Sequence, residues 1–388
     1  MVENYELLQT QDGPAWIRSS ALQDLREIDA IVFDCDGVLV DTRESYDATI
    51  AVTADRLLQT MVGVRLPWKG LAPRLTTNLR RTGGFNNDWD STYALVLFSV
   101  LAIPETFTTK LTDGSLPIAN RGERNFSSGE IGTIAGKVET IVQEFCSSMT
   151  TSSIGWRAVN EFLQHKNSDS KTASAIAKAQ ECVAYPGRPP ASLLATIFDE
   201  TYHGPKLFQE MYRIQASHYR GRGLIENERL LIRRADLDAA SKLVGKRNLA
   251  MATGRPYLAT QHILRDIMNY FNREASVFIG DMDVYPELAA TLAPYQKPSG
   301  RSLIRARQTL SSDMVLYVGD SGADVKMAED ARQSKEPVVF AGIYGKDHTK
   351  ESDFFRKREA DLILPTARQV PVILRLVRNE KRDDQQEN

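Results

Sequence analysis

The feature that most constrains this chain is a short apolar run that ends in two carboxylates. Residues 31–33 read Ile-Val-Phe, and Asp34, Cys35, Asp36 and Gly37 follow. A short apolar run predicts a buried strand, and alternate residues of a strand share a face. Both carboxylates can therefore reach one small volume just past the strand end. Two such anions repel each other unless a cation or a shared proton lies between them.

A divalent cation would resolve that repulsion, and Mg²⁺ suits sparse carboxylate sites. The pattern is typical of phosphoryl chemistry, in which one aspartate is the nucleophile and the other gives and takes a proton. Alternatively, Asp-x-Asp-Gly is a turn, a helix N-cap or part of a calcium loop. The calcium interpretation lacks alternating oxygen ligands, because Val38, Leu39 and Val40 follow the glycine.

Size and composition indicate a soluble globular protein with one large domain or two ordinary ones. The chain has 388 residues, of which 42% are hydrophobic and 25% charged. Its net charge of −2 and pI of about 6.3 give no electrostatic signature for nucleic acid or anionic membrane. No apolar stretch has transmembrane length, and residues 1–11 do not resemble a secretion signal. We therefore expect neither nucleic acid nor a membrane as a partner, and the oligomeric state stays open.

The three cysteines lie far apart in the sequence, at Cys35, Cys146 and Cys182. Their odd number and their spacing fit neither a disulfide framework nor a metal cluster, so we expect a reducing, cytoplasmic compartment. Cys35 points to the face opposite the two acids, where we expect a packed apolar residue.

Five short apolar runs predict buried parallel strands. Helical patterns separate the later runs, which predicts an α/β fold: a Rossmann-like, doubly wound parallel sheet with helices on both faces. Ligand sites of such sheets lie at the carboxyl ends of the strands, where Asp34, Thr253 and Asp320 follow three of the runs. The five runs are residues 30–33, 249–252, 314–318, 337–341 and 361–364.

Roughly 200 residues, a domain's worth of chain, separate the first predicted strand from the second. Helical patterns dominate this interval, so we interpret it as an inserted, mainly helical cap domain. Its polar stretches 110–132 and 166–178 are expected to be loops or linkers. The expected division is an N-terminal extension (1–24), a core (25–43 and 240–375), an enlarged cap (44–239) and a disordered tail (376–388).

Two further segments place phosphate-binding groups beside predicted strand ends. Thr253-Gly254 precedes a helix start, where a hydroxyl and backbone N–H groups can cradle a phosphate. The same residues also describe an ordinary capped turn. Lys297 precedes Pro298, which favours an extended backbone, and its ammonium can neutralise a phosphate or steady a carboxylate. A solvated loop lysine is the alternative.

Another acidic pair follows the run at 314–318. Asp320 can complete a metal site with Asp34, since a strand-end acid beside two glycines has little structural purpose. Asp324 lies in the first turn of the next predicted helix, where it can bind a metal-bound water or orient Lys297. The alternative for Asp324 is compensation of the helix dipole.

Taken in order, these segments resemble the four sequence motifs of the haloacid dehalogenase (HAD) superfamily. The resemblance covers roughly residues 28–43 and 240–370, and the insertion after the first motif is similar to that of members with a helical cap. It implies the HAD core fold. The matching motifs are Asp34-x-Asp36-Gly-Val, Thr253-Gly254, Lys297-Pro298 and Gly319-Asp320 with Asp324 after three residues.

The resemblance also implies a Mg²⁺-dependent phosphatase acting on a small phosphorylated metabolite. Asp34 would be the nucleophile that forms an aspartyl-phosphate, and Asp36 the general acid and base. The dehalogenase members lack an acid at the position of Asp36, which disfavours dehalogenation. The implied metal ligands are Asp34, the backbone carbonyl of Asp36, Asp320 and Asp324, and the implied phosphate-binding groups are Thr253, Gly254 and Lys297.

Two departures from the family pattern weaken any transfer of substrate. Ser299-Gly300 stands where a second proline is usual, and the cap segment 113–185 is larger than the minimal version. Other superfamily activities stay open as alternatives: a sugar-phosphate phosphomutase, a phosphonatase that would need a lysine from the cap, or a catalytically degenerate regulatory protein.

A polar loop of the cap is our candidate for substrate contact. Asn86, Asn87, Asp88 and Trp89 combine amide, acid and aromatic groups, and we expect them to bind a polar leaving group. The alternative is a capped helix start at Asn87 or Asp88. Arg255, beside the Thr-Gly motif, is a weaker candidate for substrate binding.

Overall fold

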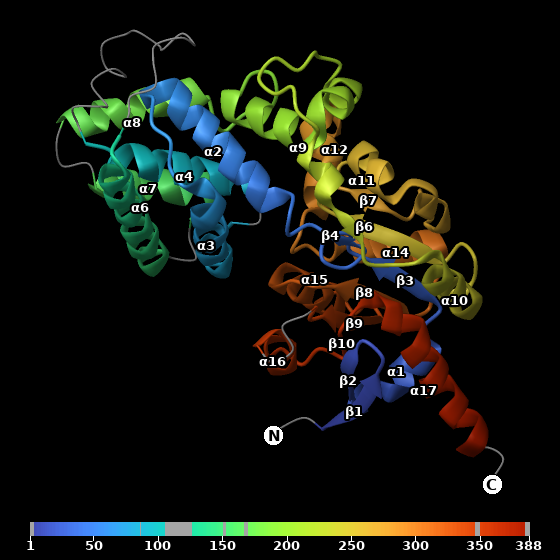
Figure 1. Cartoon of the computed structure of the whole chain (residues 1–388). Coiled ribbons are helices and arrows are strands. Elements are labelled where there is room, and N and C mark those ends of the chain that lie inside the picture. The colour runs from blue at the N-terminus through green and yellow to red at the C-terminus, as the bar shows by residue number, and fades with distance from the viewer. Residues whose placement is uncertain are drawn as a thin grey trace. The chain divides into compact units, whose positions relative to one another are not determined.

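The computed structural model describes residues 4–85, 87–104, 126–149, 153–166, 170–345 and 350–384. Its contacts divide into two compact units, a sheet unit (Met1–Thr42 and Glu228–Asn388) and a helical unit (Arg43–Asn227) (Figure 1). The chain returns to the sheet unit earlier than the expected boundary at residue 240. The reason is local: β5 (Arg229–Leu230) pairs with β4 (Val40–Asp41).

An eight-stranded sheet in the order β1-β2-β10-β9-β8-β3-β6-β7 forms the sheet unit. The strands from β10 to β7 are parallel, which confirms the α/β prediction, and all five predicted strands are present. The strands are β1 (Tyr5–Thr10), β2 (Gly13–Arg18), β3 (Ala30–Phe33), β6 (Leu249–Thr253), β7 (Val277–Phe278), β8 (Val315–Gly319), β9 (Val338–Ile343) and β10 (Leu362–Leu364).

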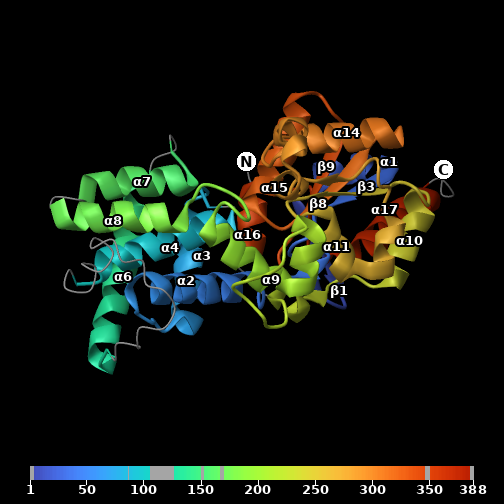
Figure 2. The same ribbon diagram turned by 90° about the horizontal axis from the view of Figure 1, so that it is seen from above.

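Alternation along the strands builds a hydrophobic core on each face of the sheet. Ile31 and Phe33 of β3 belong to one core, and Ala30 and Val32 to the other. Figure 2 shows the helices that cover the two faces. One face carries α1 (Leu22–Glu27), α10 (Arg234–Val244), α11 (Tyr257–Leu264) and α17 (Val370–Asp384), and the other α14 (Arg301–Leu310), α15 (Gly322–Gln333) and α16 (Lys350–Lys357).

The two chain ends of the sheet unit are more ordered than the sequence suggests. The expected N-terminal extension forms the β1–β2 hairpin, and β2 pairs antiparallel with β10. The expected disorder of 376–388 is wrong over 376–384, where α17 continues to Asp384. An amphipathic pattern overrides the local charge here, because buried side chains recur every three or four positions. They are Val370, Ile373, Leu374 and Val377.

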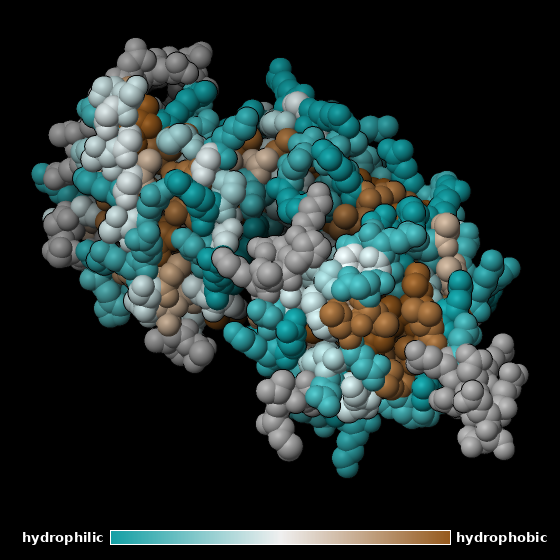
Figure 3. Space-filling model, turned by 60° about the horizontal axis from the view of Figure 1, so that its bottom comes forward, coloured by the Kyte–Doolittle hydropathy of each residue, from teal (hydrophilic) through white to brown (hydrophobic). Residues whose placement is uncertain are grey.

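Large hydrophobic side chains of β1 and α17 also reach the surface. Leu7 is 56% exposed, and Val372 and Leu376 are each 45% exposed. Figure 3, in which the bottom of the view in Figure 1 is turned forward, shows a hydrophobic area on the sheet unit. Helix α17 is thus hydrophobic on more than the side that packs against α1 and α10.

The helical unit packs around α4, in which every residue from Ser91 to Val100 is buried. A helix that is apolar on all sides is a central one. The expected loops at 128–132 and 170–178 are helical, in α6 and α8. Among the described residues, no helix combines the length and hydrophobicity needed to cross a bilayer. The helices are α2 (Tyr46–Val62), α3 (Trp68–Arg81), α4 (Asp88–Ala102), α6 (Ser128–Ser148), α7 (Gly155–Lys166), α8 (Ser170–Val183) and α9 (Leu193–Tyr212).

Strand order fixes where a ligand site of the sheet unit is expected. From central β3 the chain continues to β6 on one side, and β8 lies on the other side. The order therefore reverses between β3 and β8, and open α/β sheets bind ligands outside the carboxyl ends of the strands at such a switch point. Asp34 and Asp320 follow these two strands directly.

Candidate active site

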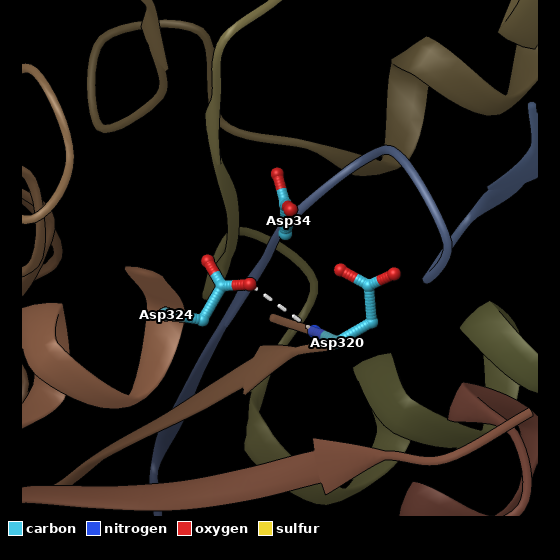
Figure 4. A group of neighbouring side chains, drawn as sticks. All are labelled: Asp34, Asp320 and Asp324. Atoms are coloured by element: carbon cyan, nitrogen blue, oxygen red, sulfur yellow. Dashed lines mark hydrogen bonds between the residues drawn. The ribbon is translucent and has the colours of Figure 1, made fainter. Parts of the chain in front are cut away.

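Three carboxyl groups meet at the switch point (Figure 4). Asp34 follows β3, Asp320 follows β8, and Asp324 lies in the first turn of α15; one oxygen of each lies within 4.8 Å of the others. Asp34 and Asp324 are buried, whereas Asp320 is exposed. The sequence-predicted acids of two separate strands therefore share one volume.

Lys297 supplies the cationic group at this cluster. It lies between the short helix 293–295 and α14, and its ammonium donates to Asp34 at 2.9 Å and to Asp324 at 2.6 Å. Burial acts to lower the pKa of Lys297, but the two carboxylates hold that pKa well above its usual range. Lys297 is therefore a fixed cation rather than a solvated loop lysine.

Asp324 is held by a dense set of hydrogen bonds. Its Oδ1 accepts from the Tyr317 hydroxyl at 2.5 Å, and its Oδ2 accepts from the Ser321 hydroxyl at 2.6 Å and from the backbone N–H of Asp320 at 3.2 Å. Burial acts to raise the pKa of Asp324, but Lys297 and these donors outweigh it and lower the pKa. With both oxygens engaged, Asp324 is better suited to orient Lys297 than to bind a metal.

Tyr317 is a site residue that the sequence reasoning missed. It lies on β8, its side chain is fully buried, and Lys297 Nζ lies 6.0 Å from its ring centroid. A buried phenol needs a hydrogen-bond partner, and Asp324 is that partner. The signal in the sequence was a single tyrosine within an otherwise apolar strand that ends in a motif.

The donor set fits a divalent cation. Burial raises the pKa of Asp34 to about 7, although Lys297 acts in the opposite direction, and repulsion from Asp324 and Asp36 adds to the rise. Three carboxyl groups share one ammonium, so negative charge is left uncompensated. Hard oxygen donors at this density suit Mg²⁺ or a similar ion.

Gly37 brings the first motif's loop against Asp320. Its φ is +71°, and a Cβ built on it would lie 1.7 Å from Asp320 Oδ2. Only glycine allows this close approach and this backbone angle. The loop is closed by a hydrogen bond from the Gly37 N–H to the Val40 carbonyl at 2.8 Å, so the Asp36–Gly37 peptide lies beside the acidic cluster.

Thr253 and Gly254 lie at the carboxyl end of β6, next to β3. Thr253 is buried, and its hydroxyl oxygen accepts from the Arg255 N–H at 3.2 Å, which leaves the hydroxyl proton able to donate to a ligand. A Cβ on Gly254 would meet no atom within 4 Å. Open space beside Gly254 is compatible with the predicted phosphate cradle.

Asp36 and Arg255 are paired with each other. Arg255 Nε donates to Asp36 Oδ1, and the Arg255 guanidinium also pairs with Glu228. Arg255 is 2% exposed. These contacts lend no support to the expectation that Arg255 binds substrate: a buried guanidinium between two carboxylates is placed to hold other side chains.

The polar loop of the helical unit has structural contacts. The side chain of Asn87 caps α4 by accepting from the Trp89 N–H at 2.9 Å, Asp88 pairs with Arg80 at 2.9 Å, and Trp89 Nε1 donates to Asp199 at 3.1 Å. These contacts match the alternative of a capped helix start and lend no support to a substrate role. Asn86, the fourth predicted contact, lies outside the described residues.

The three cysteines are free thiols. Cys35 is fully buried in the core on one face of the sheet, as expected for a packed apolar residue. Burial raises its thiol pKa well above the usual value, so Cys35 is not a nucleophile of this site.

Comparisons with known proteins yield structural neighbours alone, since no family model and no curated protein matches the chain. An X-ray structure of a structural-genomics target, ZR25, has a TM-score of 0.55 at 18% identity and covers 89% of this chain and 98% of its own. Phosphatase Tt82 from Thermococcus thioreducens has a TM-score of 0.48 at 22% identity, over 84% and 97% of the two chains.

The first of these likenesses supports a shared fold over most of the chain. The strand order supplies the switch point, the acids and the Thr-Gly turn lie at the ends of its parallel strands, and Lys297 reaches Asp34 from the segment before α14. The chain thus shares a doubly wound α/β fold with the ZR25 structure.

Proposed function

We propose that this protein is a Mg²⁺-dependent phosphatase that hydrolyses a small phosphorylated molecule through an aspartyl-phosphate on Asp34. The observation that carries the proposal is the convergence of Asp34, Asp320 and Lys297 at the switch point of the sheet. A nucleophile, a fixed cation and uncompensated oxygen donors are the groups that phosphoryl transfer requires. A scaffold without activity gains nothing from such mutually repelling acids.

In the first step an Asp34 carboxylate oxygen attacks phosphorus, forming an O–P bond while the bond from phosphorus to the leaving oxygen breaks. Asp36 protonates that leaving oxygen as it departs. Lys297 and the hydroxyl of Thr253 donate to the oxygens of the phosphoryl group, and Asp324 keeps the Lys297 ammonium in place.

In the second step water attacks phosphorus and the bond to Asp34 breaks, which restores the carboxylate and releases inorganic phosphate. Asp36, now ionised, takes the proton of the attacking water. Asp34, Asp320 and the backbone carbonyl of Asp36 would hold Mg²⁺, which when bound would neutralise charge on the transferring group. The returning proton leaves Asp36 ready for the next turnover.

Phosphate release tests the proposal. The purified protein with Mg²⁺ is incubated with a panel of phosphate monoesters, and we expect at least one to release phosphate. Asp34→Asn should lower kcat by about 10³-fold or more, because the nucleophile is lost. Asp353→Asn is the matched control, since Asp353 lies exposed on α16 and forms a surface pair with Arg356.

Equal phosphate release by wild type and Asp34→Asn would contradict the proposal. Conversion of one sugar phosphate into an isomer, with a bisphosphate needed as activator and little free phosphate formed, would instead identify a phosphomutase.

A further inference from the structure

Three charged side chains, those of Glu228, Arg255 and Asp36, contact one another in series. The Arg255 guanidinium forms two contacts of 2.8 Å with Glu228, from Nη2 to Oε1 and from Nη1 to Oε2. Its Nε donates to Oδ1 of Asp36. The side chains of Arg255 and Glu228 are 1% and 0% exposed, whereas that of Asp36 is 34% exposed. This series of side chains therefore leads from the buried Glu228 to the partly exposed carboxylate of Asp36.

Backbone hydrogen bonds fix the segments that carry these three residues. Glu228 directly precedes β5, whose pairing with β4 ties it to the loop that carries Asp36. The Leu231 N–H donates to the Leu39 carbonyl at 2.8 Å and strengthens this tie. The Arg255 N–H donates to the Thr253 hydroxyl, at the end of β6. Three segments of the sheet unit thus converge on one guanidinium.

Such an arrangement costs stability, because a buried arginine and a buried glutamate both lose their hydration. A guanidinium is a planar fork that fixes direction as well as charge, which an ammonium on a flexible stem does not. Here Nη2 donates to Glu228, Nη1 lies against the same carboxylate as an ion pair, and Nε donates to Asp36. The carboxylate of Asp36 is therefore restrained in direction by a rigid neighbour.

We propose that Arg255 and Glu228 are positioning residues, which hold the Asp36 carboxylate where it exchanges a proton with the leaving oxygen. This proposal rests on the proposed phosphatase function. Protonation of the leaving oxygen matters when that oxygen would depart as a strongly basic alkoxide and hardly matters for a nitrophenolate. Loss of the positioning therefore slows the first step far more for alkyl phosphates than for p-nitrophenyl phosphate, whereas the second step is the same for both esters.

The test compares Arg255→Gln and Glu228→Gln with wild type on an active alkyl phosphate and on p-nitrophenyl phosphate. For the alkyl ester we expect kcat/KM, which reports the first step, to fall by about 10- to 100-fold, and for the nitrophenyl ester by less than about threefold. Arg255→Lys should recover little, because the fork is lost. The matched control Arg332→Gln breaks another ion pair of the sheet unit, with Asp361, and should affect both esters equally.

A double-mutant cycle separates positioning from general damage to the fold. In an Asp36→Asn background, Arg255→Gln should cause no further loss on the alkyl ester, because the group it positions is already absent. Multiplicative losses in the double variant, or equal losses of kcat/KM on the two esters in the single variants, would overturn the proposal.

A crystal structure of Arg255→Gln gives a readout that does not depend on turnover. We expect the Asp36 side chain to adopt another rotamer or several rotamers, and an unchanged Asp36 would refute its positioning by Arg255. The proposed function fails in a different way, through wild-type protein that releases no more phosphate than Asp34→Asn. The two failures are therefore distinguishable.

Discussion

At the scale of single residues, the site combines groups that destabilise the fold with glycines that make room for them. Asp34 is buried with its pKa raised to about 7, against an ordinary value of 3.8. Gly37 lies so close to Asp320 that no other residue fits without displacing it. Both features oppose stability or restrict sequence, and both are expected where a site is built for chemistry.

The raised pKa of Asp34 predicts a pH-dependent cost to stability. The folded protein binds a proton there that the unfolded chain has released, so the free energy of unfolding falls as pH rises from about 4 to about 7. Without divalent cations, Asp34→Asn should therefore unfold a few degrees above wild type at about pH 8 and match it near pH 4. Calorimetry between about pH 4 and about pH 8 measures the unfolding temperatures of the two proteins. A difference between these temperatures that does not vary with pH would contradict the prediction.

Gly37→Ala should disable the site while the fold persists. The new Cβ would collide with the Asp320 carboxylate, and φ of +71° is unfavourable for alanine. We expect phosphatase activity to fall by about 10²-fold or more, since displacement of a site carboxylate weakens transition-state stabilisation. Gly132→Ala is the matched control, because a Cβ there meets nothing within 4 Å. Phosphate release measures the loss of activity, and circular dichroism shows whether the fold persists. A Gly37→Ala variant with wild-type activity would contradict the predicted collision with Asp320.

At the scale of elements, the start of α4 shows a polar sequence used for capping. Asn87 accepts from the Trp89 N–H, and Asp88 joins Arg80, which also pairs with Asp47 of α2 at 2.9 Å. Burial acts to lower the pKa of Arg80, but the two carboxylates raise it above its usual range. These contacts tie α2, α3 and α4 together.

Asn87→Ala distinguishes capping from substrate binding. Loss of the cap should cost about 1 kcal/mol of unfolding free energy, with KM unchanged. Asn87→Ser, which retains a capping oxygen, should keep most of the stability. Thermal unfolding and steady-state kinetics measure the two effects, and a raised KM at unchanged stability would restore the substrate hypothesis.

At the scale of the whole molecule, the acidic cluster and its lysine belong to the sheet unit alone. The net charge of the chain is only −2, so attraction of a cation depends on the local cluster rather than on the overall field. Binding of an ion to the native state stabilises the part of the fold that holds it.

Mg²⁺ should therefore slow amide hydrogen exchange in residues 30–37 and 315–324, at the ends of β3 and β8, and chelation should reverse this. Peptides of α4 in the helical unit should exchange at an unchanged rate. Asp320→Asn should abolish the Mg²⁺ effect. Hydrogen exchange read by mass spectrometry measures these rates, and protection that Mg²⁺ leaves unaltered at both strand ends would contradict the metal site.

Local pattern was sufficient to predict the strands and the acids that follow them. A buried parallel strand is recognisable in the sequence as a short apolar run; Asp34 and Asp320 each follow one, and Thr253 is the last residue of another. The β1–β2 hairpin and the end of α17 escaped prediction, because their pairing and burial come from residues hundreds of positions away, as in the pairing of β2 with β10.

The sequence by itself determined the α/β class, the strand-end acids and the lysine, because these depend on periodicity and on motifs read locally. Only the tertiary structure decided what each polar group does with its neighbours. It paired Arg255 with Asp36 and Glu228, gave Asp324 the Tyr317 hydroxyl, and used Asn87 as a helix cap. Side-chain partners depend on which strand ends meet in space, and no local pattern encodes that meeting.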